Sequence, residues 1–185
     1  LELYGPYPFS SEKTIKEWKA ITPQLGFSGS GFFNYNVSDF RSLLDEYGLK
    51  AKSAHIHLHT LNTRMPEVGD AARSLGLECV GIAYIPEEKR KTLDGYKRMA
   101  DEFNVLGDLA KKEGLKFIYH NHGYGLKEQD DQVPMKLILD NTDPELVFFE
   151  MDIFWTTAGG ANPIEYLKSY PNRYLCIHLK DMSKL

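Results

Sequence analysis

The sequence predicts an α/β fold in which parallel strands, joined by helices, form an incomplete barrel. β-rich runs alternate with helical patterns along all 185 residues, which is typical of parallel strands with crossover helices. No phosphate-binding glycine fingerprint follows any run, because Gly123 and Gly125 lack its spacing. The length alone favours an open doubly wound sheet, since an eight-stranded barrel usually needs about 250 residues. The chain nevertheless begins on a strand and ends without a final helix, which indicates a barrel cut at both ends.

Six runs have the length and composition of strands, and no linker or internal repeat divides them. We therefore expect one domain over residues 1–185. The expected strands are 1–5, 51–58, 78–85, 116–122, 146–155 and 174–180.

The clearest helical patterns lie between these strands. Apolar residues recur at helical spacing from Phe40 to Tyr47, with Asn36 or Ser38 as a cap and Gly48 placed to end the helix.

Two further helices are expected later in the chain. A longer helical pattern covers 92–113 and stops at Gly114. Asn162 and Pro163 form a capped start for a short helix that reaches about Lys168.

The segment 6–36 is less regular. It contains an expected helix at 11–20 and a loop at 26–34 that is rich in glycine, serine and aromatic residues. This segment is either a lid over the strand ends or a plain connection.

Charge and composition exclude some classes of partner. The net charge is −4, with 22 basic and 26 acidic residues, so no overall field attracts nucleic acid. No apolar run is long enough to span a bilayer, and no signal peptide opens the chain. A cytoplasmic location is favoured, and a periplasmic one would require an export signal before Leu1. Cys79 and Cys176 lie in apolar runs, which favours two buried thiols over a disulfide or a metal pair.

Histidine and carboxylate residues gather at the carboxyl ends of the expected strands. Alternate residues of a strand face the same side, and in a barrel the inward set at these ends forms the active site. His120, Asp152 and His178 are each inward on a different strand, so we expect them to meet. His57 and His59 are weaker members, because their strand ends near them and they are expected to face solvent.

A shared metal ion explains such a cluster. Ionisable groups buried together are costly unless they pair or bind a cation. Imidazole with carboxylate suits Mn²⁺, Zn²⁺, Fe²⁺ or Co²⁺ better than Ca²⁺, which prefers oxygen alone. The expected ligands are His120, Asp152 and His178.

Five runs of the sequence match motifs of a known family: LELY at 1–4, LLDEYGLKAKSAH at 43–55, FIYHNHG at 117–123, DPELVFFEMDIFWTTAGG at 143–160 and HLKDM at 178–182. With these motifs the sequence resembles the sugar phosphate isomerase/epimerase family of xylose-isomerase-like TIM barrels. The resemblance covers nearly the whole chain in family order. The resemblance implies a (β/α)8 barrel of which this chain carries strands two to seven and lacks the first and eighth. Two sheet edges would then be unpaired, so further chain or a partner, such as a second copy in a homo-oligomer, is expected to cover them.

The resemblance further implies a ligand set. In this family a Glu on strand five, an Asp on strand six, a His on strand seven and a Glu on strand eight typically hold the metal. Asp152 and His178 match two of these positions, whereas His120 stands where the strand-five Glu is expected. The two glutamates also move the proton in family epimerases, so neither expected base is visible here.

The implied chemistry is deprotonation or hydride transfer beside a carbonyl, with a metal that stabilises the enediolate charge. His122 or His120 is the expected acid or base, and Lys180 is expected to steady a developing oxyanion. The remaining residues are expected to bind substrate, His55 through a hydroxyl and the aromatic ones against a sugar ring. They are His55, Asn121, Trp155 and Tyr4.

The leading expectation is thus a metal-dependent sugar or sugar phosphate isomerase or epimerase acting on a small carbohydrate. Replacement of Glu by His at position 120 leaves open an eliminative cleavage of keto-glycosides on the same barrel. A non-catalytic carbohydrate-binding barrel is a third reading. An endonuclease of related type is disfavoured, because the basic groove that it needs is lacking.

Overall fold

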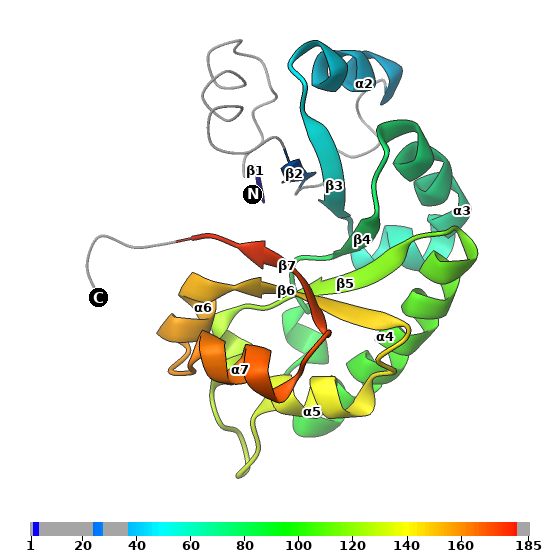
Figure 1. Ribbon diagram of the computed structural model, residues 1–185. Helices are drawn as coiled ribbons and strands as arrows, with labels where there is room; N and C mark the ends of the chain where they lie inside the picture. Colours follow the sequence, from blue (N-terminus) through cyan, green and yellow to red (C-terminus); the bar gives the residue numbers. More distant parts are fainter. Residues whose placement is uncertain (1, 4–23, 28–36, 181–185) are drawn as a thin grey trace.

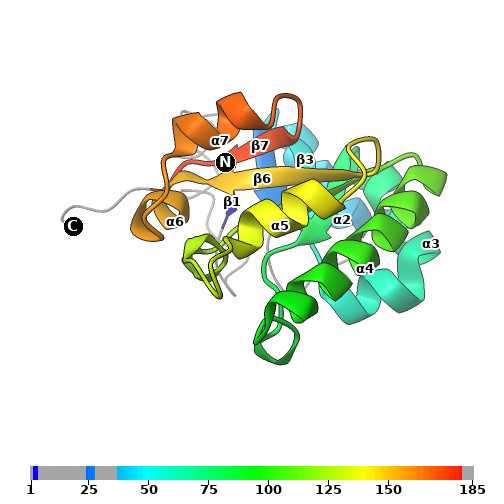
Figure 2. The same ribbon diagram turned by 90° about the horizontal axis from the view of Figure 1, so that it is seen from below.

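The computed structural model describes residues 2–3, 24–27 and 37–180, and in this part of the chain seven parallel strands form one sheet (Figure 1). Neighbouring strands follow one another in chain order, without the reversal of order that an open doubly wound sheet has. The strands are β1 (Glu2–Leu3), β2 (Gln24–Phe27), β3 (Lys50–His55), β4 (Cys79–Ile82), β5 (Lys116–His120), β6 (Val147–Asp152) and β7 (Tyr174–His178). The sheet curls as part of a barrel wall, with helices along its outer side (Figures 1 and 2). The expected incomplete (β/α)8 barrel is confirmed.

The count of six strands was one too low. Residues 26–34 were expected to be a loop, but Gln24–Phe27 forms β2 and pairs with β1 on one side and β3 on the other. A four-residue strand with Gly26 inside it has little β-propensity of its own, and pairing on both sides supplies its hydrogen bonds. The segment at 1–5 therefore holds the first strand of the sheet and not the second, and the described residues contain seven strands where six were expected. The expected helix at 11–20, Tyr4 and most of the expected lid lie outside the described residues.

Two expected strands continued too far because a helix follows each of them closely. The run 51–58 ends its strand at His55, and helix α3 (Leu58–Leu75) begins three residues later. The run 146–155 ends its strand at Asp152, and helix α6 (Ile153–Ala158) follows at once. In both runs apolar residues continue past the end of the strand, so the sequence pattern does not show where the strand stops.

The helices with clear caps were predicted correctly. They are α2 (Val37–Glu46), α4 (Leu93–Lys112) and α7 (Pro163–Ser169). The Thr92 hydroxyl accepts a hydrogen bond from the Gly95 backbone N–H at 3.1 Å, and Asn162 Oδ1 accepts one from Ile164 N at 2.9 Å.

Other helices were not anticipated. They are α3, α6, α5 (Pro134–Asn141) and the short 3₁₀ turns η1 (Glu87–Lys89) and η2 (Gly123–Leu126). Pro66 lies inside α3 and Arg64 has non-helical angles, so a kink interrupts the pattern that would have indicated this helix. No helix in the described residues is long and apolar enough to cross a membrane.

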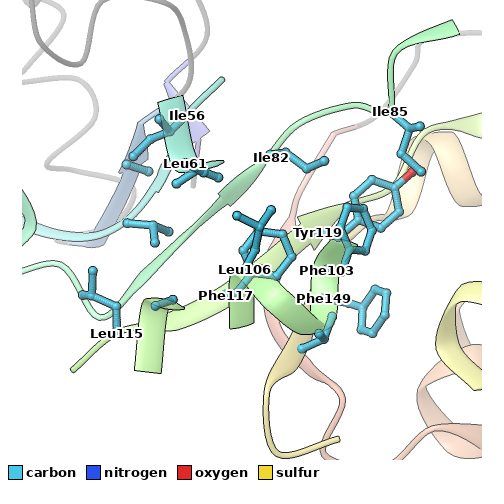
Figure 3. Close-up of a cluster of buried hydrophobic side chains, with 14 of the residues drawn as sticks. Ile56, Leu61, Ile82, Ile85, Phe103, Leu106, Leu115, Phe117, Tyr119 and Phe149 are labelled. Carbon is cyan, nitrogen blue, oxygen red and sulfur yellow. The ribbon is translucent and has the colours of Figure 1, made fainter. Parts of the chain in front are cut away.

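The main core lies between the outer face of the sheet and helix α4. Phe103 of α4 contacts Phe117 and Tyr119 of β5, with ring centroids 5.3 and 5.1 Å apart, and Phe149 of β6 extends the cluster (Figure 3). All four rings are fully buried. These residues alternate along the strands with the inward ones, so the same strands supply both the core and the barrel interior.

Candidate metal centre and active site

The carboxyl ends of β5, β6 and β7 bring three predicted ligands together. Asp152 is in register with His178 on the neighbouring strand, and His120 lies one strand away on the other side. His178 Nδ1 is 3.0 Å and His120 Nε2 is 3.6 Å from Asp152 Oδ2. One donor atom from each of the three residues lies within 4.8 Å of the others, and all three side chains are buried. A single ion fits this spacing.

Two of the facing atoms, one of His120 and one of Asp152, are not satisfied by hydrogen bonds within the described residues. Nε2 of His120 and Oδ2 of Asp152 are buried and make none with the described residues. Nδ1 of His178 lies 3.0 Å from Oδ2 of Asp152. A buried polar atom without a hydrogen bond costs about 1–3 kcal/mol, so such atoms need a partner. A cation between them is a partner that imidazole nitrogen and carboxylate oxygen suit.

Asp152 is oriented by the turn from β6 into α6. It caps this helix, because its Oδ1 accepts a hydrogen bond from Trp155 N at 2.8 Å, which leaves Oδ2 for the centre. Asn121 holds the same turn: its Oδ1 accepts from Asp152 N at 3.0 Å and its Nδ2 donates to Thr156 Oγ1 at 3.1 Å. Asn121 was predicted to bind substrate, but it is buried and its amide is engaged in these bonds.

Glu150 belongs to the same cluster and was missed. It lies two residues before Asp152 on the inward face of β6, in register with His120. Its Oε1 is 3.3 Å from His120 Nδ1 and its Oε2 is 3.0 Å from His55 Nε2. His55 was expected to bind a substrate hydroxyl, and here its ring is buried against this carboxylate. The alternation along β6 and a glutamate in an apolar run were the signals that could have identified Glu150.

The carboxyl groups stay ionised although they are buried. Burial raises the pKa of Glu150, but the hydrogen bonds with His120 and His55 outweigh it and the net pKa is lowered. For Asp152 burial again raises the pKa, and the contacts with His178 and the Trp155 N–H lower it further than burial raises it. The centre therefore offers negative charge to a cation.

His122 lies beside the centre and is suited to proton transfer. Its ring centroid is 5.0 Å from that of His120, and its Nδ1 is buried and makes no hydrogen bond with the described residues. Burial, followed by the neighbouring His120, lowers the pKa of His122 to about 4, so the ring is neutral at pH 7. A neutral imidazole can accept a proton from a nearby carbon or hydroxyl.

Aromatic side chains and one lysine border His122. Trp155 lies 5.6 Å from the His122 ring, and Tyr124 stacks on it at 5.8 Å. Nζ of Lys180 lies 4.7 Å above the Trp155 ring and 4.8 Å above Phe154. Lys180 is thereby held next to the centre, just beyond the end of β7.

The other predicted residues do not join this cluster. His57 and His59 are exposed at the start of α3, as expected. Tyr4 lies outside the described residues. Cys79 and Cys176 are free thiols, as expected; Cys79 is buried as expected, whereas Cys176 is only half-buried.

Comparison with known protein families shows to which family the chain belongs. Residues 18–185 match the model of the xylose isomerase-like TIM barrel family. The chain belongs to this family. The resemblance seen in the sequence motifs is therefore confirmed, and the strand-end centre lies where barrels of this type carry their active sites.

Curated relatives of this family member carry enzyme names, which supports the expectation of an enzyme. An inosose dehydratase from Clostridium beijerinckii is 33% identical over 131 residues, which is 68% of this chain and 41% of the relative. The match thus spans about two fifths of that relative.

Solved structures agree with the fold. A sugar phosphate isomerase/epimerase from Parabacteroides distasonis superposes with a TM-score of 0.79 at 25% identity, over 90% of this chain and 70% of that one. The IOLI protein with a bound zinc atom superposes with a TM-score of 0.72 at 16% identity, over 95% of this chain and 70% of that one. At this low identity the second match supports the fold alone.

Proposed function

We propose that the chain is part of a divalent-metal-dependent enzyme that moves a proton at the carbon beside a carbonyl of a sugar or a sugar-like ring. The observation that carries the proposal is the set of unsatisfied donor atoms of His120 and Asp152 next to the neutral ring of His122. The enzyme names of the relatives support it.

Each residue has a role in this proposal. His120, Asp152 and His178 would hold the ion, each through one donor atom. The ion, which is Mn²⁺, Zn²⁺, Fe²⁺ or Co²⁺, would act as a Lewis acid on substrate oxygens and offset the negative charge that develops there. His122 takes the proton and returns it.

Two further groups would complete the substrate site. Trp155 offers a flat face to the ring of the substrate, because its own ring borders His122. Lys180 lies close enough to approach an oxygen that gains negative charge.

Return of the proton by His122 to the neighbouring carbon would make the enzyme an isomerase, which is the reaction we propose first; return to the opposite face of the same carbon, by a second group, would make it an epimerase. Elimination is the second candidate, and the relatives named inosose dehydratase favour it. Within the described residues, His122 is the one side chain at the centre to which we assign the role of base. Loss of a hydroxyl or alkoxyl group next to the abstracted proton can use one base, because the proton that His122 takes can be passed to the departing oxygen, whereas epimerisation needs delivery of a proton to the opposite face of the carbon.

Solvent isotope exchange tests the proposal. The full chain is loaded with Mn²⁺, Zn²⁺, Co²⁺ or Fe²⁺ and incubated in D₂O with ketoses, inososes and keto-glycosides, and the products are analysed by mass spectrometry and NMR. Deuterium beside the carbonyl with an unchanged formula would identify an isomerase or epimerase. Loss of water or of an alcohol would identify elimination. Sugar binding without exchange in any substrate would reject catalysis and leave a binding barrel.

Replacement of the base gives a residue-level prediction. His122→Gln should lower the rate of exchange by about 10²- to 10⁴-fold, because general acid–base catalysis contributes that much. Affinity for Co²⁺ should be retained, since His122 is not among the ligands. His57→Gln, at an exposed histidine outside the cluster, is the matched control and should exchange at the rate of the unchanged chain. Equal rates in both variants would remove His122 from the mechanism.

A further inference from the structure

Glu150 divides its carboxylate between two histidines inside the barrel. One oxygen faces His120 Nδ1 at 3.3 Å and the other faces His55 Nε2 at 3.0 Å. All three side chains are at most 3% exposed, so no bulk water competes for these bonds. Neither the sequence motifs nor the proposed ligand set gives Glu150 a function.

The path from His55 to Glu150 is open because strand β4 places no side chain between them. Gly81 of β4 is in register with His55 on one side and with Ile118 on the other. A Cβ atom at Gly81 would lie 1.8 Å from the Ile118 carbonyl oxygen, so no larger residue fits there. The rings of His55 and His120 consequently approach to 5.1 Å across β4.

The hydrogen bonds of Glu150 decide which nitrogen of His120 carries its proton. An ionised carboxylate only accepts hydrogen bonds, so the Nδ1 atom that faces it must bear the hydrogen. In a neutral imidazole the lone pair is then on Nε2, the atom directed at Asp152 Oδ2. The opposite tautomer would direct an N–H group at Asp152 and block a cation.

We propose that Glu150 is a positioning residue that fixes the Nδ1–H tautomer of His120 and thereby prepares Nε2 to bind the metal, with His55 anchoring the second carboxylate oxygen. This inference rests on the proposed function, because it presumes an ion at His120, Asp152 and His178. Carboxylates that orient a metal-bound histidine raise its basicity, and their loss typically weakens metal affinity by about 10- to 100-fold.

Two measurements on the full chain test this role. Ring ¹⁵N chemical shifts from long-range ¹H–¹⁵N NMR of the metal-free chain report the tautomer of each of the six histidines, and a His120→Gln spectrum assigns the signal of interest. Calorimetric titration with Co²⁺ reports the affinity of the centre. Glu150→Gln keeps the size of the side chain but can direct an amide N–H at Nδ1. Glu145→Gln is the same change at an exposed position just before β6 and is the control.

We expect His120 to carry its proton on Nδ1 in the unchanged chain and in Glu145→Gln. In Glu150→Gln the Nε2–H form should appear, and the affinity for Co²⁺ should fall by about 10- to 100-fold. An unchanged chain with Nε2–H at His120, or a Glu150→Gln variant with unaltered affinity, would overturn the inference while leaving the metal site intact. If Glu150→Gln does not fold, the tautomer in the unchanged chain still decides. No binding of Co²⁺ by the unchanged chain would instead overturn the proposed function, while Nδ1–H at His120 would still support the effect of Glu150 on the tautomer.

Discussion

The two faces of strands β5 and β6 differ in chemistry at their carboxyl ends although their residues alternate along the same backbone. The outer face carries Phe117, Tyr119 and Phe149, which are buried against helix α4. The inner face carries His120, Glu150 and Asp152, which are equally buried but are held by a few polar contacts. Because the strand period is two, one face can stabilise the fold while the other is free to carry a reactive site. The comparison therefore predicts that changes to the outer face affect stability, and changes to the inner face affect ligand binding.

The largest effect on stability is expected on the outer face. Phe103→Ala removes a fully buried ring between β5 and α4 and should lower the free energy of unfolding by about 3–5 kcal/mol. The folded fraction should bind Co²⁺ as tightly as the unchanged chain. Urea unfolding with calorimetry measures both quantities, and Val105→Ala, at an exposed position of the same helix, is the control. A weakened Co²⁺ affinity in Phe103→Ala would show that the two faces are not independent.

An intermediate effect is expected at Gly81, where the two faces are coupled through the backbone. Gly81→Ala would force β4 away from β5, because its Cβ would meet the Ile118 carbonyl oxygen. We expect a loss of about 1–3 kcal/mol in stability, together with weaker Co²⁺ binding as His55 moves relative to Glu150. Gly125→Ala, where a Cβ meets only ordinary contacts, should change neither quantity. Normal Co²⁺ binding in Gly81→Ala would contradict the coupling.

The smallest effect on stability is expected at Asp152, although its effect on binding is the greatest. Asp152→Asn keeps the side-chain volume and an oxygen that can cap α6, so the free energy of unfolding should change by about 1 kcal/mol or less. The affinity for Co²⁺ should fall by more than about 100-fold, beyond the loss expected for an orienting carboxylate. Thermal unfolding of the metal-free chain measures the change in stability, and calorimetric titration with Co²⁺ measures the change in affinity. Retained Co²⁺ binding would remove Asp152 from the ligands.

Local signals in the sequence were sufficient for much of the fold. Helix α4 followed from its apolar period and its cap at Thr92, and α7 from Asn162 and Pro163. Each of these signals acts within a few residues, so no knowledge of the tertiary structure was needed. Strand β2 and helix α3 were missed because Gly26 and Pro66 weaken the local pattern, and neighbouring elements supply what these segments lack.

The sequence predicted that three of the clustered residues lie close together, but not which other side chains they contact. The alternation along each strand placed His120, Asp152 and His178 on the inward face. Which inward side chains touch depends on the register between strands, such as the pairing of His120 with Glu150, and one sequence does not contain that information. Glu150 lies on the inward face by the same alternation, but no role was predicted for it because its contacts depend on this register.

The ring of hydrogen bonds around the β6–α6 turn has a consequence for the choice of ion. Asn121 and Thr156 hold the backbone on both sides of the Asp152 carboxylate, and Thr156 Oγ1 also donates to the Asp152 carbonyl at 2.8 Å. The carboxylate is thus aimed when the chain folds, and little ordering entropy is lost when an ion arrives. If the centre holds an ion as proposed, this fixed carboxylate is expected to disfavour the larger and more variable coordination sphere of calcium, in addition to the effect of the donor atoms.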